Sequence, residues 1–411
     1  MRLLLLAPLL ATLLPTGLQA QRDTPASTCA ADDAGLQLPS GFCGIPFASG
    51  LGRVRHLAVA PNGDVFVATR GDSGGVVSLR DADGDGRAET VHRFGPGGGT
   101  GIALGHDALY FALNDRVVRW AWAPGQLEPA GEPAIILGDL PTAGNHGAKS
   151  LALGKDGALY LGVGSASNSC QQQNRADRSP GQDPCPELAT RAGIWRFDAA
   201  KVGQRQADGE RFATGLRNPT AIALQPSSGT LYAAPHGRDQ LSDNWGFSDS
   251  LNAELPSEEF VVVTRGDDFG WPYCYYDHLQ RRKVLAPEYG GDGKSAGRCG
   301  QAKRPAIGFP GHWAPMAIAF QPSDAFGKDY QGGAFVAFHG SWNRAPLPQA
   351  GFRVAFVPFR DGKPTGEYST FATRRDNSQG LRAAGVAIGP DGSLYIADEN
   401  AGTITRVVRQ P

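Results

Sequence analysis

The sequence lacks several features that would assign it to common protein classes. Its formal net charge is −1 with lysine and arginine dispersed along the chain, so no basic face predicts binding to nucleic acid or to an anionic membrane. The six cysteines lack the paired short spacing of zinc ligands, and there is no Cys-x-x-Cys-His motif for haem attachment. Beyond the N-terminus no apolar run is long enough to span a bilayer. We therefore expect no nucleic-acid partner and no membrane insertion.

Methionine is also rare, with 2 residues, whereas the chain of 411 residues contains 56 glycines and 30 prolines. This composition predicts many tight turns and few long helices. The length is compatible with two or three domains, but it also suits one large all-β domain.

The N-terminus resembles a secretory signal peptide, with Arg2, an apolar segment over residues 3–14 and a small-residue ending at Ala20. We expect cleavage near Ala20 and a periplasmic or secreted mature protein. Export and an even number of cysteines favour disulfides over a metal site. Because the cysteines fall into three sequence-local pairs, the predicted disulfides are Cys29–Cys43, Cys170–Cys185 and Cys274–Cys299.

One unit recurs along the chain: an apolar-Ala-apolar strand, a turn rich in Pro, Gly or Asp, and an apolar-aromatic pair that opens a second strand. Six copies begin at Leu57, Ile102, Leu151, Ile222, Ile318 and Val386. Several copies close with a third strand, as at Val117, Gly193 and Thr403. Short antiparallel strands repeated in this way bury their faces by radial packing. The sequence therefore predicts an all-β fold, a six-bladed β-propeller.

The spacing between copies widens after the third, fourth and fifth, which indicates insertions that carry Cys170, Cys185, Cys274 and Cys299. Long insertions on a rigid scaffold often form a binding face. We divide the chain into a signal peptide (1–20), an N-terminal extension (21–44) and a catalytic propeller (45–411).

Residues just upstream of each inner strand surround the entrance of the central channel in a propeller. In this chain they are largely polar or cationic: Arg55 and His56, Gly98 to Thr100, Asn145 and His146 with Lys149, Arg217 and Asn218, His312 and Trp313, and Leu381 and Arg382. A lone histidine before a strand is usually a loop residue that hydrogen-bonds a carbonyl. Convergence with these cations on one axis predicts instead that His146 is a general base in a binding pocket.

Five motifs in order resemble the pyrroloquinoline quinone-dependent glucose/sorbosone dehydrogenases, from about Gly52 onward and closer to the sorbosone-type branch. They are Asn145-His146-Gly147, Gly215-Leu216-Arg217-Asn218-Pro219, Phe269-Gly270-Trp271-Pro272, the segment 338–344 (FHGSWNR) and the segment 385–392 (GVAIGPDG). The resemblance implies an aldose or sugar-aldehyde dehydrogenase that transfers hydride to bound pyrroloquinoline quinone (PQQ), with a sugar as substrate and an electron acceptor that the sequence does not identify.

The resemblance also implies residue roles. His146 matches the base that accepts the proton of the anomeric hydroxyl, and Arg217 matches the arginine over the quinone carbonyl, where its charge stabilises developing negative charge. Asn218 matches the hydrogen-bonding neighbour of that arginine. Asn145 stands where the family often has Asp, so His146 must be oriented in another way. The glutamines that flank the base in the glucose branch are missing, which leaves the sugar open.

PQQ carries three carboxylates, and its pocket needs fixed positive charge. Lys149, Arg344 and Arg382 stand at positions that resemble the family's anchors, and Arg55 and His312 are pocket candidates by their place before inner strands. Calcium beside the quinone is typical of the family, and the main-chain carbonyls of Gly237 and Arg238 align with its ligands.

A second candidate calcium site is the acidic loop with Asp81, Asp83, Asp85 and Glu89, where carboxylates alternate and glycines allow sharp turns. His92 occupies the twelfth position, where an EF-hand needs glutamate. A solvated acidic turn between strands accounts for the same residues, and bound calcium would have a structural role.

Two other functions fit a propeller. A calcium-dependent sugar lactone hydrolase would need convergent Glu, Asp and Asn ligands in the channel, whereas the positions before the strands are cationic. A non-catalytic module that binds protein or glycan would carry aromatic patches on a blade face and an arbitrary channel.

Overall fold

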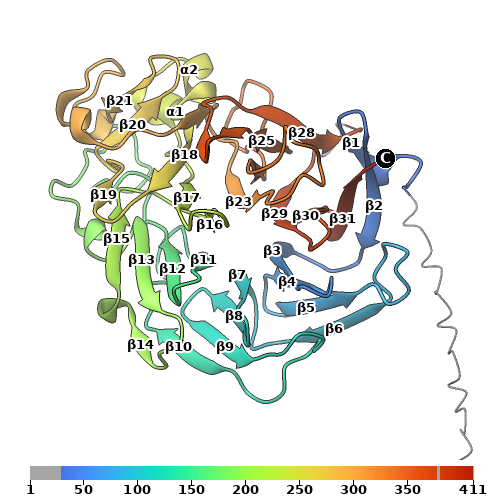
Figure 1. The fold of residues 1–411 in the computed structure, drawn as a ribbon. Helices are drawn as coiled ribbons and strands as arrows, with labels where there is room; N and C mark the ends of the chain where they lie inside the picture. The colour runs from blue at the N-terminus through green and yellow to red at the C-terminus, as the bar shows by residue number, and fades with distance from the viewer. Residues whose placement is uncertain (1–28, 377–379, 411) are drawn as a thin grey trace, which may run out of the picture.

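In a computed structural model, which describes residues 29–376 and 380–410, six β-sheets are arranged in a ring around a central axis (Figure 1). The inner strands of neighbouring sheets contact one another in a closed cycle, from β3 through β7, β11, β16, β23 and β29 back to β3. The predicted six-bladed β-propeller is therefore confirmed.

In the first three blades, the strands follow one another from the axis outwards. Blade one contains β3 (Val54–Val59), β4 (Val65–Thr69), β5 (Gly75–Arg80) and β6 (Thr90–Phe94). Blade two contains β7 (Gly99–Leu104), β8 (Ala108–Leu113), β9 (Val117–Ala121), β10 (Ala134–Gly138) and β14 (Gln204–Arg205). Blade three contains β11 (Lys149–Leu153), β12 (Ala158–Val163), β13 (Gly193–Asp198), β15 (Glu210–Thr214) and β19 (Asp267–Asp268).

The other three blades complete the ring. Blade four contains β16 (Ala221–Leu224), β17 (Leu231–Ala234), β18 (Glu258–Val263) and β22 (Ile307–Phe309). Blade five contains β23 (Pro315–Phe320), β24 (Ala334–Phe338), β25 (Arg353–Val357), β28 (Ser369–Arg374) and β1 (Leu36–Gln37). Blade six contains β29 (Ala383–Ile388), β30 (Leu394–Asp398), β31 (Thr403–Arg409) and β2 (Phe42–Ala48).

Few elements lie outside the blades. Two hairpins are formed by β20 (Cys274–Asp277) with β21 (Arg282–Leu285) and by β26 (Phe359–Arg360) with β27 (Lys363–Pro364). The helices are short: α1 (Leu241–Trp245), α2 (Asp249–Glu254) and the 3-10 turns Asp33–Gly35, Pro186–Ala189, Gln206–Asp208, Pro287–Tyr289 and Gly297–Gln301. No helix in the described part of the chain combines the length and apolar character needed to cross a membrane.

The apolar-Ala-apolar copies form the inner strands, and the apolar-aromatic pairs open the second strands. In the third blade, for example, Leu151 pairs with Leu161 and Leu153 pairs with Leu159. Six clusters of buried side chains fill the spaces between adjacent blades; one of them joins Phe66 of blade one to Phe111 of blade two. Each sheet therefore buries one face against each neighbour, which a single blade cannot do.

The ring is closed by the two ends of the described chain. Strand β2 pairs antiparallel with the C-terminal strand β31, and β1 pairs with β28 (Figure 1). Leu36–Gln37 and residues 42–44, which the sequence led us to assign to an N-terminal extension, thus pair within blade sheets. The expected signal peptide, residues 1–20, lies outside the described residues.

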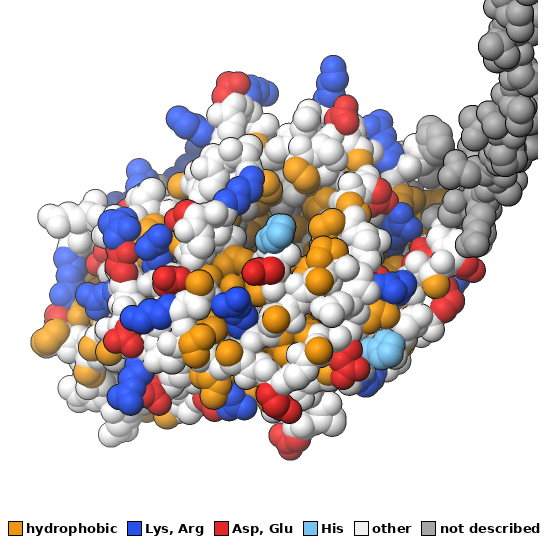
Figure 2. Space-filling view, turned by 60° about the horizontal axis from the view of Figure 1, so that its bottom comes forward, with side chains coloured by type: hydrophobic (Ala, Val, Ile, Leu, Met, Phe, Trp, Pro, Cys, Tyr) orange, Lys and Arg blue, Asp and Glu red, His pale blue; other side chains and the backbone are white. Residues whose placement is uncertain are grey.

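The three predicted disulfides, Cys29–Cys43, Cys170–Cys185 and Cys274–Cys299, are confirmed. The two insertions that carry the last two disulfides pack on each other: Arg298 pairs with Asp183 at 2.6 Å, and the hydroxyl of Tyr273 accepts from the backbone N–H of Cys185. On the face shown in Figure 2, basic and acidic side chains are interspersed, in line with the dispersed charge of the sequence.

Candidate active site

A polar cavity of about 820 Å³ lies where the segments before the inner strands meet. Five of the six inner strands or their preceding segments contribute to it, and β29 is the exception. The insertions complete its wall with Arg175, Trp342 and Asn343. Among the predicted site residues, the structure brings seven together in the cavity wall: Arg55, Asn145, His146, Arg217, Asn218, Gly237 and His312.

His146 lies in the cavity wall with its imidazole held by Ser165. Its Nδ1 is 2.9 Å from the Ser165 carbonyl oxygen and 3.0 Å from Oγ of the same residue. A carbonyl can only accept, so Nδ1 carries the hydrogen and Nε2 keeps its lone pair. Burial, together with the charges of Arg217 and His236, lowers the pKa of His146 well below its usual value. The ring is therefore neutral and able to accept a proton at Nε2.

The contact between His146 and Ser165 is sterically possible because each of the two segments contains a glycine, Gly144 and Gly164. A Cβ on Gly164 would lie 2.4 Å from Cβ of His146, and a Cβ on Gly144 would lie 2.4 Å from the Ala166 carbonyl oxygen. Asn145 donates its backbone N–H to that same carbonyl at 2.9 Å. Ser165 thus orients the imidazole of His146, whereas the family often has an aspartate before the histidine.

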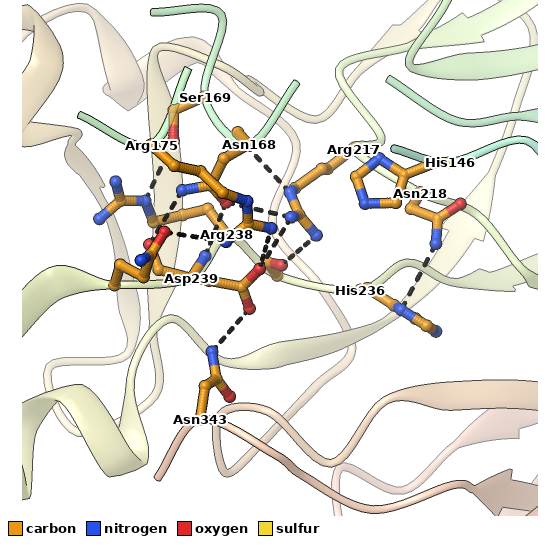
Figure 3. Close-up of polar contacts among 12 residues, drawn as sticks. His146, Asn168, Ser169, Arg175, Arg217, Asn218, His236, Arg238, Asp239 and Asn343 are labelled. Carbon is orange, nitrogen blue, oxygen red and sulfur yellow. Dashed lines mark hydrogen bonds and ion pairs between the residues drawn. The ribbon is translucent and has the colours of Figure 1, made fainter. Parts of the chain in front are cut away.

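Arg217 is buried beside His146, and all three nitrogens of its guanidinium donate to oxygen acceptors (Figure 3). It donates to the carbonyl and side chain of Asn168, each at 3.0 Å, and to the Gly237 carbonyl at 2.6 Å. Its remaining partner is the carboxylate of Asp239, at 3.1 Å. The charge of Arg217 is therefore fixed in position before any ligand binds.

Asp239 is the carboxylate around which the cationic side of the cavity is built. Besides Arg217 it pairs with Arg175 at 2.7 Å and accepts from the amide of Asn343 at 2.8 Å (Figure 3). Burial alone would raise the pKa of Asp239, but Arg217 and His312 lower it well below its usual value. Asp239 is thus ionised and joins residues from three separate segments of the chain.

Asn218 and His236 form a second polar pair in the wall (Figure 3). Nε2 of His236 donates to the Pro315 carbonyl at 2.9 Å, so Nδ1 is free to accept from the Asn218 amide at 3.4 Å. Burial, with the charge of Arg217, lowers the pKa of His236 to about 4. The predicted hydrogen-bonding residue Asn218 therefore lies between two neutral imidazoles.

Arg55 enters the cavity from β3 and pairs with Glu399 at 2.9 Å, as do the more exposed Arg53 and Arg70 at 3.3 and 2.7 Å. Burial would raise the pKa of Glu399, but the hydrogen bond from His339 and the charge of Arg55 lower it to about 2. Three guanidiniums on one carboxylate leave a positive excess at this side of the cavity. His312 also lines the cavity, and its Nε2 donates to the Asn252 carbonyl at 2.6 Å.

Three residues predicted to anchor the cofactor do not line the cavity. Lys149 is buried and donates to the carbonyls of Pro141 and Gly147, at 3.0 and 2.6 Å, and burial lowers its pKa to about 8. It thus fixes the loop that carries His146.

Arg344 and Arg382 also have other partners. Arg344 donates to the carbonyls of Ala253 and Gly311 and pairs with Glu254 at 3.1 Å. Arg382 lies 5.0 Å over the ring of Phe352, in a separate pocket. Neither residue lines the active-site cavity although both backbone positions match the family's motifs, because a backbone position does not fix which way a long side chain turns.

The two predicted calcium sites differ in their surroundings. The Gly237 carbonyl already accepts from Arg217, and the Arg238 side chain turns away to pair with Glu288. In the outer loop between β5 and β6, oxygens of Asp81, Asp83, Asp85 and Glu89 lie within 4.8 Å of one another. Backbone N–H groups of the same loop, such as those of Gly84 and Gly86, already donate to these carboxylates, as in a closed acidic turn.

Sequence reasoning missed five charged residues of the cavity wall: Arg53, Arg70, Arg175, Asp239 and Glu258. Asp239 follows the predicted calcium turn, Arg175 lies in the first disulfide-bearing insertion, and Glu258 begins β18. Burial raises the pKa of Glu258 to about 7, against the lowering effect of its hydrogen bond from Gly237 N–H. Arg53 directly precedes β3, but the other four do not precede an inner strand, so the repeat pattern carried no signal for them.

Comparison with known proteins identifies relatives of the whole ring. Residues 36–410 match the TrAA12-like family. A pyrroloquinoline quinone-dependent pyranose dehydrogenase of Coprinopsis cinerea is 24% identical over 91% of this chain and 54% of its own length. The chain spans about half the length of the first curated relatives that it matches, 48% and 54%.

Solved structures share the fold at low identity. The holo form of the pyranose dehydrogenase PQQ domain from Coprinopsis cinerea aligns with a TM-score of 0.75 and 19% identity, over 94% of this chain and 99% of that domain. A calcium structure of the Trichoderma reesei enzyme of carbohydrate-active family AA12 aligns with a TM-score of 0.77 and 16% identity, over 95% and 100% of the two chains. The half of the pyranose dehydrogenase that this chain covers thus corresponds in fold to its PQQ domain.

Proposed function

This chain belongs to the TrAA12-like family, and from that premise we propose that it is a PQQ-dependent sugar dehydrogenase that oxidises an aldose or a sugar aldehyde of the sorbosone or glucose type. The observation that carries the proposal is a neutral, oriented imidazole at His146 beside the fixed charge of Arg217 in one cavity. The relative from Coprinopsis cinerea is named for this chemistry.

The cavity fits a cofactor with three carboxylates. Its wall contains Arg53, Arg55, Arg70 and Arg175, and its volume of about 820 Å³ lies in the range of cofactor pockets. Nε of Arg55 and Oδ1 of Asn343 are buried in the wall without a hydrogen-bond partner. Such atoms are rare in folded proteins unless a ligand completes them. We infer that Arg55, with Arg53 and Arg70, would hold the acidic part of PQQ.

The quinone, when bound, supplies the hydride acceptor. The chain supplies proton removal and charge: Nε2 of His146 accepts the proton of the sugar's anomeric hydroxyl while Nδ1 stays fixed on the Ser165 carbonyl. Arg217 cannot turn away, because Asn168, Gly237 and Asp239 hold its donors, so its charge stabilises negative charge that develops nearby. Asn218, beside both groups, can orient a sugar hydroxyl.

Calcium at Gly237 and Arg238 stays a prediction through which we derive no step. Support comes from the calcium structure of the Trichoderma reesei relative. The guanidinium that already donates to the Gly237 carbonyl opposes a second cation at the same oxygen.

Export is likewise part of the proposal, supported by three formed disulfides, which persist in oxidising compartments.

For the lactone hydrolase alternative, the described residues place two carboxylates in the cavity wall, Asp239 and Glu258, and no group of three that could share an ion there. Asp239 is occupied by Arg175, Arg217 and Asn343. Within the described residues, the acidic loop at Asp81 is where three or more His, Cys, Asp or Glu side chains come close enough to share an ion. With calcium and a sugar lactone, we therefore expect no hydrolysis.

The test is reduction of the reconstituted holoenzyme by candidate sugars, followed by stopped-flow spectroscopy. His146→Gln keeps the size and a polar edge but removes the base, and should bind PQQ normally while its reductive step slows about 10²–10⁴-fold. His92→Gln, at an exposed position on β6, is the matched control and should retain the wild-type rate. A wild-type reductive rate in the His146 variant, with cofactor bound, would overturn this assignment.

A further inference from the structure

A second pocket, of about 870 Å³, lies between the fifth and sixth blades. Arg382 lies just before β29, so the pocket opens on the same end of the ring as the active-site cavity, which is lined from the segments before the inner strands. We call it the arginine pocket, and its lining includes Gln37, Gln349, Phe352, Arg353, Arg374 and Arg382. Neither Asp nor Glu is among the described residues that line it.

The arginine pocket carries uncompensated positive charge. Arg374 is neutralised by Asp398, at 2.7 Å. Neither Arg353 nor Arg382 forms an ion pair with a carboxylate in the described part of the chain, whereas Arg55, Arg70, Arg175 and Arg217 of the active-site cavity all do. Two guanidinium charges therefore remain at one pocket without a carboxylate partner. Water solvates such charges more readily at an open surface than in a pocket.

Both guanidiniums are fixed in place by aromatic rings. Arg353 lies 4.2 Å over the ring of Trp313, and Arg382 lies 5.0 Å over that of Phe352. Phe352 is itself wedged between two glycines, since a Cβ on Gly340 or on Gly380 would lie 2.0 or 2.5 Å from its ring. Stacking holds the plane of a guanidinium but leaves its N–H edge available to a ligand.

The donors of the two arginines are largely unused. Arg353 donates to the hydroxyl of Thr370 at 2.7 Å, while its Nε is buried without a partner. Among the described residues, the Arg382 side chain has one hydrogen-bond contact, from a terminal nitrogen to Nδ1 of His339 at 3.4 Å. Gln349 uses its side-chain oxygen to accept from Ser341, which leaves its NH₂ group as a further donor. The lining therefore offers hydrogen-bond donors and positive charge. Its described residues include no carboxylate that could accept those hydrogen bonds or balance that charge.

We propose that the arginine pocket is a binding site for a small oxyanion, a carboxylate or a phosphate, separate from the active-site cavity. Planar forked donors match the paired oxygens of these groups, and fixed guanidiniums lose little freedom on binding. The oxyanion has two possible sources: a free inorganic anion, or the carboxylate of an acidic sugar.

The pocket is also connected to the active site. Arg382 contacts Nδ1 of His339, whose Nε2 donates to Glu399 at 2.9 Å, and Glu399 holds Arg55 in the cavity wall. His339 therefore connects an oxyanion site at Arg382 to Glu399, the carboxylate that pairs with the arginines of the cavity.

The experiment is calorimetric titration of the cofactor-free full chain at low ionic strength, with inorganic phosphate, glucuronate and glucose as separate ligands. Phosphate should bind the wild type, and Arg382→Gln and Arg353→Gln should each weaken it about tenfold or more, as expected for a charged hydrogen bond. One control carries the same change of charge: Arg205→Gln, at a side chain 74% exposed on β14, which should bind phosphate like the wild type. Arg70→Gln, in the active-site cavity, distinguishes phosphate bound there from phosphate bound in the arginine pocket.

A second pair of variants avoids substitution of packed arginines. Gln37 is an exposed residue of β1 at the pocket wall, so Gln37→Glu should weaken phosphate binding about tenfold and Gln37→Lys should not weaken it. Glucuronate binding that follows the same pattern, with no binding of glucose, assigns the site to acidic sugars, whereas binding of phosphate alone assigns it to inorganic anions. Absence of both phosphate binding and glucuronate binding overturns the proposal. Loss of phosphate binding in Arg70→Gln but not in Arg382→Gln also overturns it.

Discussion

Replacing Asp239 with asparagine tests whether this carboxylate holds the cationic side of the active site together. The substitution keeps the shape of the side chain and one oxygen acceptor but removes the charge. Arg217, whose side chain is 4% exposed, then loses its ion pair at 3.1 Å, and Arg175 loses its pair at 2.7 Å. Two guanidiniums would face each other without a counter-charge in the cavity wall.

The magnitude follows from the geometry. Two unit charges 3.1 Å apart attract by about 5 kcal/mol at an effective dielectric constant of ~20, before the cost of burying them is subtracted. Breaking a buried pair by removal of one partner typically costs about 3–5 kcal/mol, because the other charge stays buried. We therefore expect Asp239→Asn to lower the free energy of unfolding by about 3–5 kcal/mol.

The assay is urea unfolding of the cofactor-free protein with its disulfides intact, followed by tryptophan fluorescence. Asp115→Asn is the matched control, since Asp115 pairs with Arg116 at 2.7 Å but is 52% exposed, and it should cost less than about 1 kcal/mol. In a cycle with Arg217→Gln, the double variant should be more stable than the sum of the single effects by about 1–3 kcal/mol. Additive effects, or a cost as small as that of the control, would refute the reasoning.

Three further predictions concern the insertion, the channel and the acidic loop. Replacing Cys170 and Cys185 together with alanine should weaken PQQ binding several-fold in a calorimetric titration, because the disulfide closes the insertion that supplies cavity residues; unchanged affinity would contradict this. Burial, with the charge of Arg55, lowers the pKa of His56 to about 4, so stability present above pH 6.5 should be lost, by on the order of 3 kcal/mol, as pH falls to 4. His56→Gln should flatten this part of the pH profile of the melting temperature, and an identical profile would count against it. Calcium should raise the melting temperature of the wild type but not of Asp85→Asn if the acidic loop binds it, whereas equal shifts would identify a solvated turn.

The fold was predictable because each part of its signal is local. The apolar-Ala-apolar strand at Leu151 and its aromatic partner strand lie within about a dozen residues of each other, and their alternation identifies the buried face without knowledge of the rest. The disulfides were predictable for the same reason, since each joins cysteines separated by 14, 15 or 25 residues.

The active site was predictable only in part. His146 and Arg217 stand before inner strands, and the propeller geometry alone brings such positions to the channel. Lys149 and Arg382 stand at the same kind of position, yet one side chain holds a loop and the other stacks on Phe352. Nothing in a strand pattern states which way a long side chain turns when several carbonyls and rings compete for it.

The sequence by itself determined the number of blades, the disulfide pairs and the position of His146 at the channel. The tertiary structure decided how that imidazole is held and charged: Ser165 replaces the expected carboxylate, and Asp239 gathers Arg175, Arg217 and Asn343 from distant segments. Strand periodicity is determined by neighbouring residues. The balance of charge in a cavity depends instead on side chains that meet only when the ring has closed.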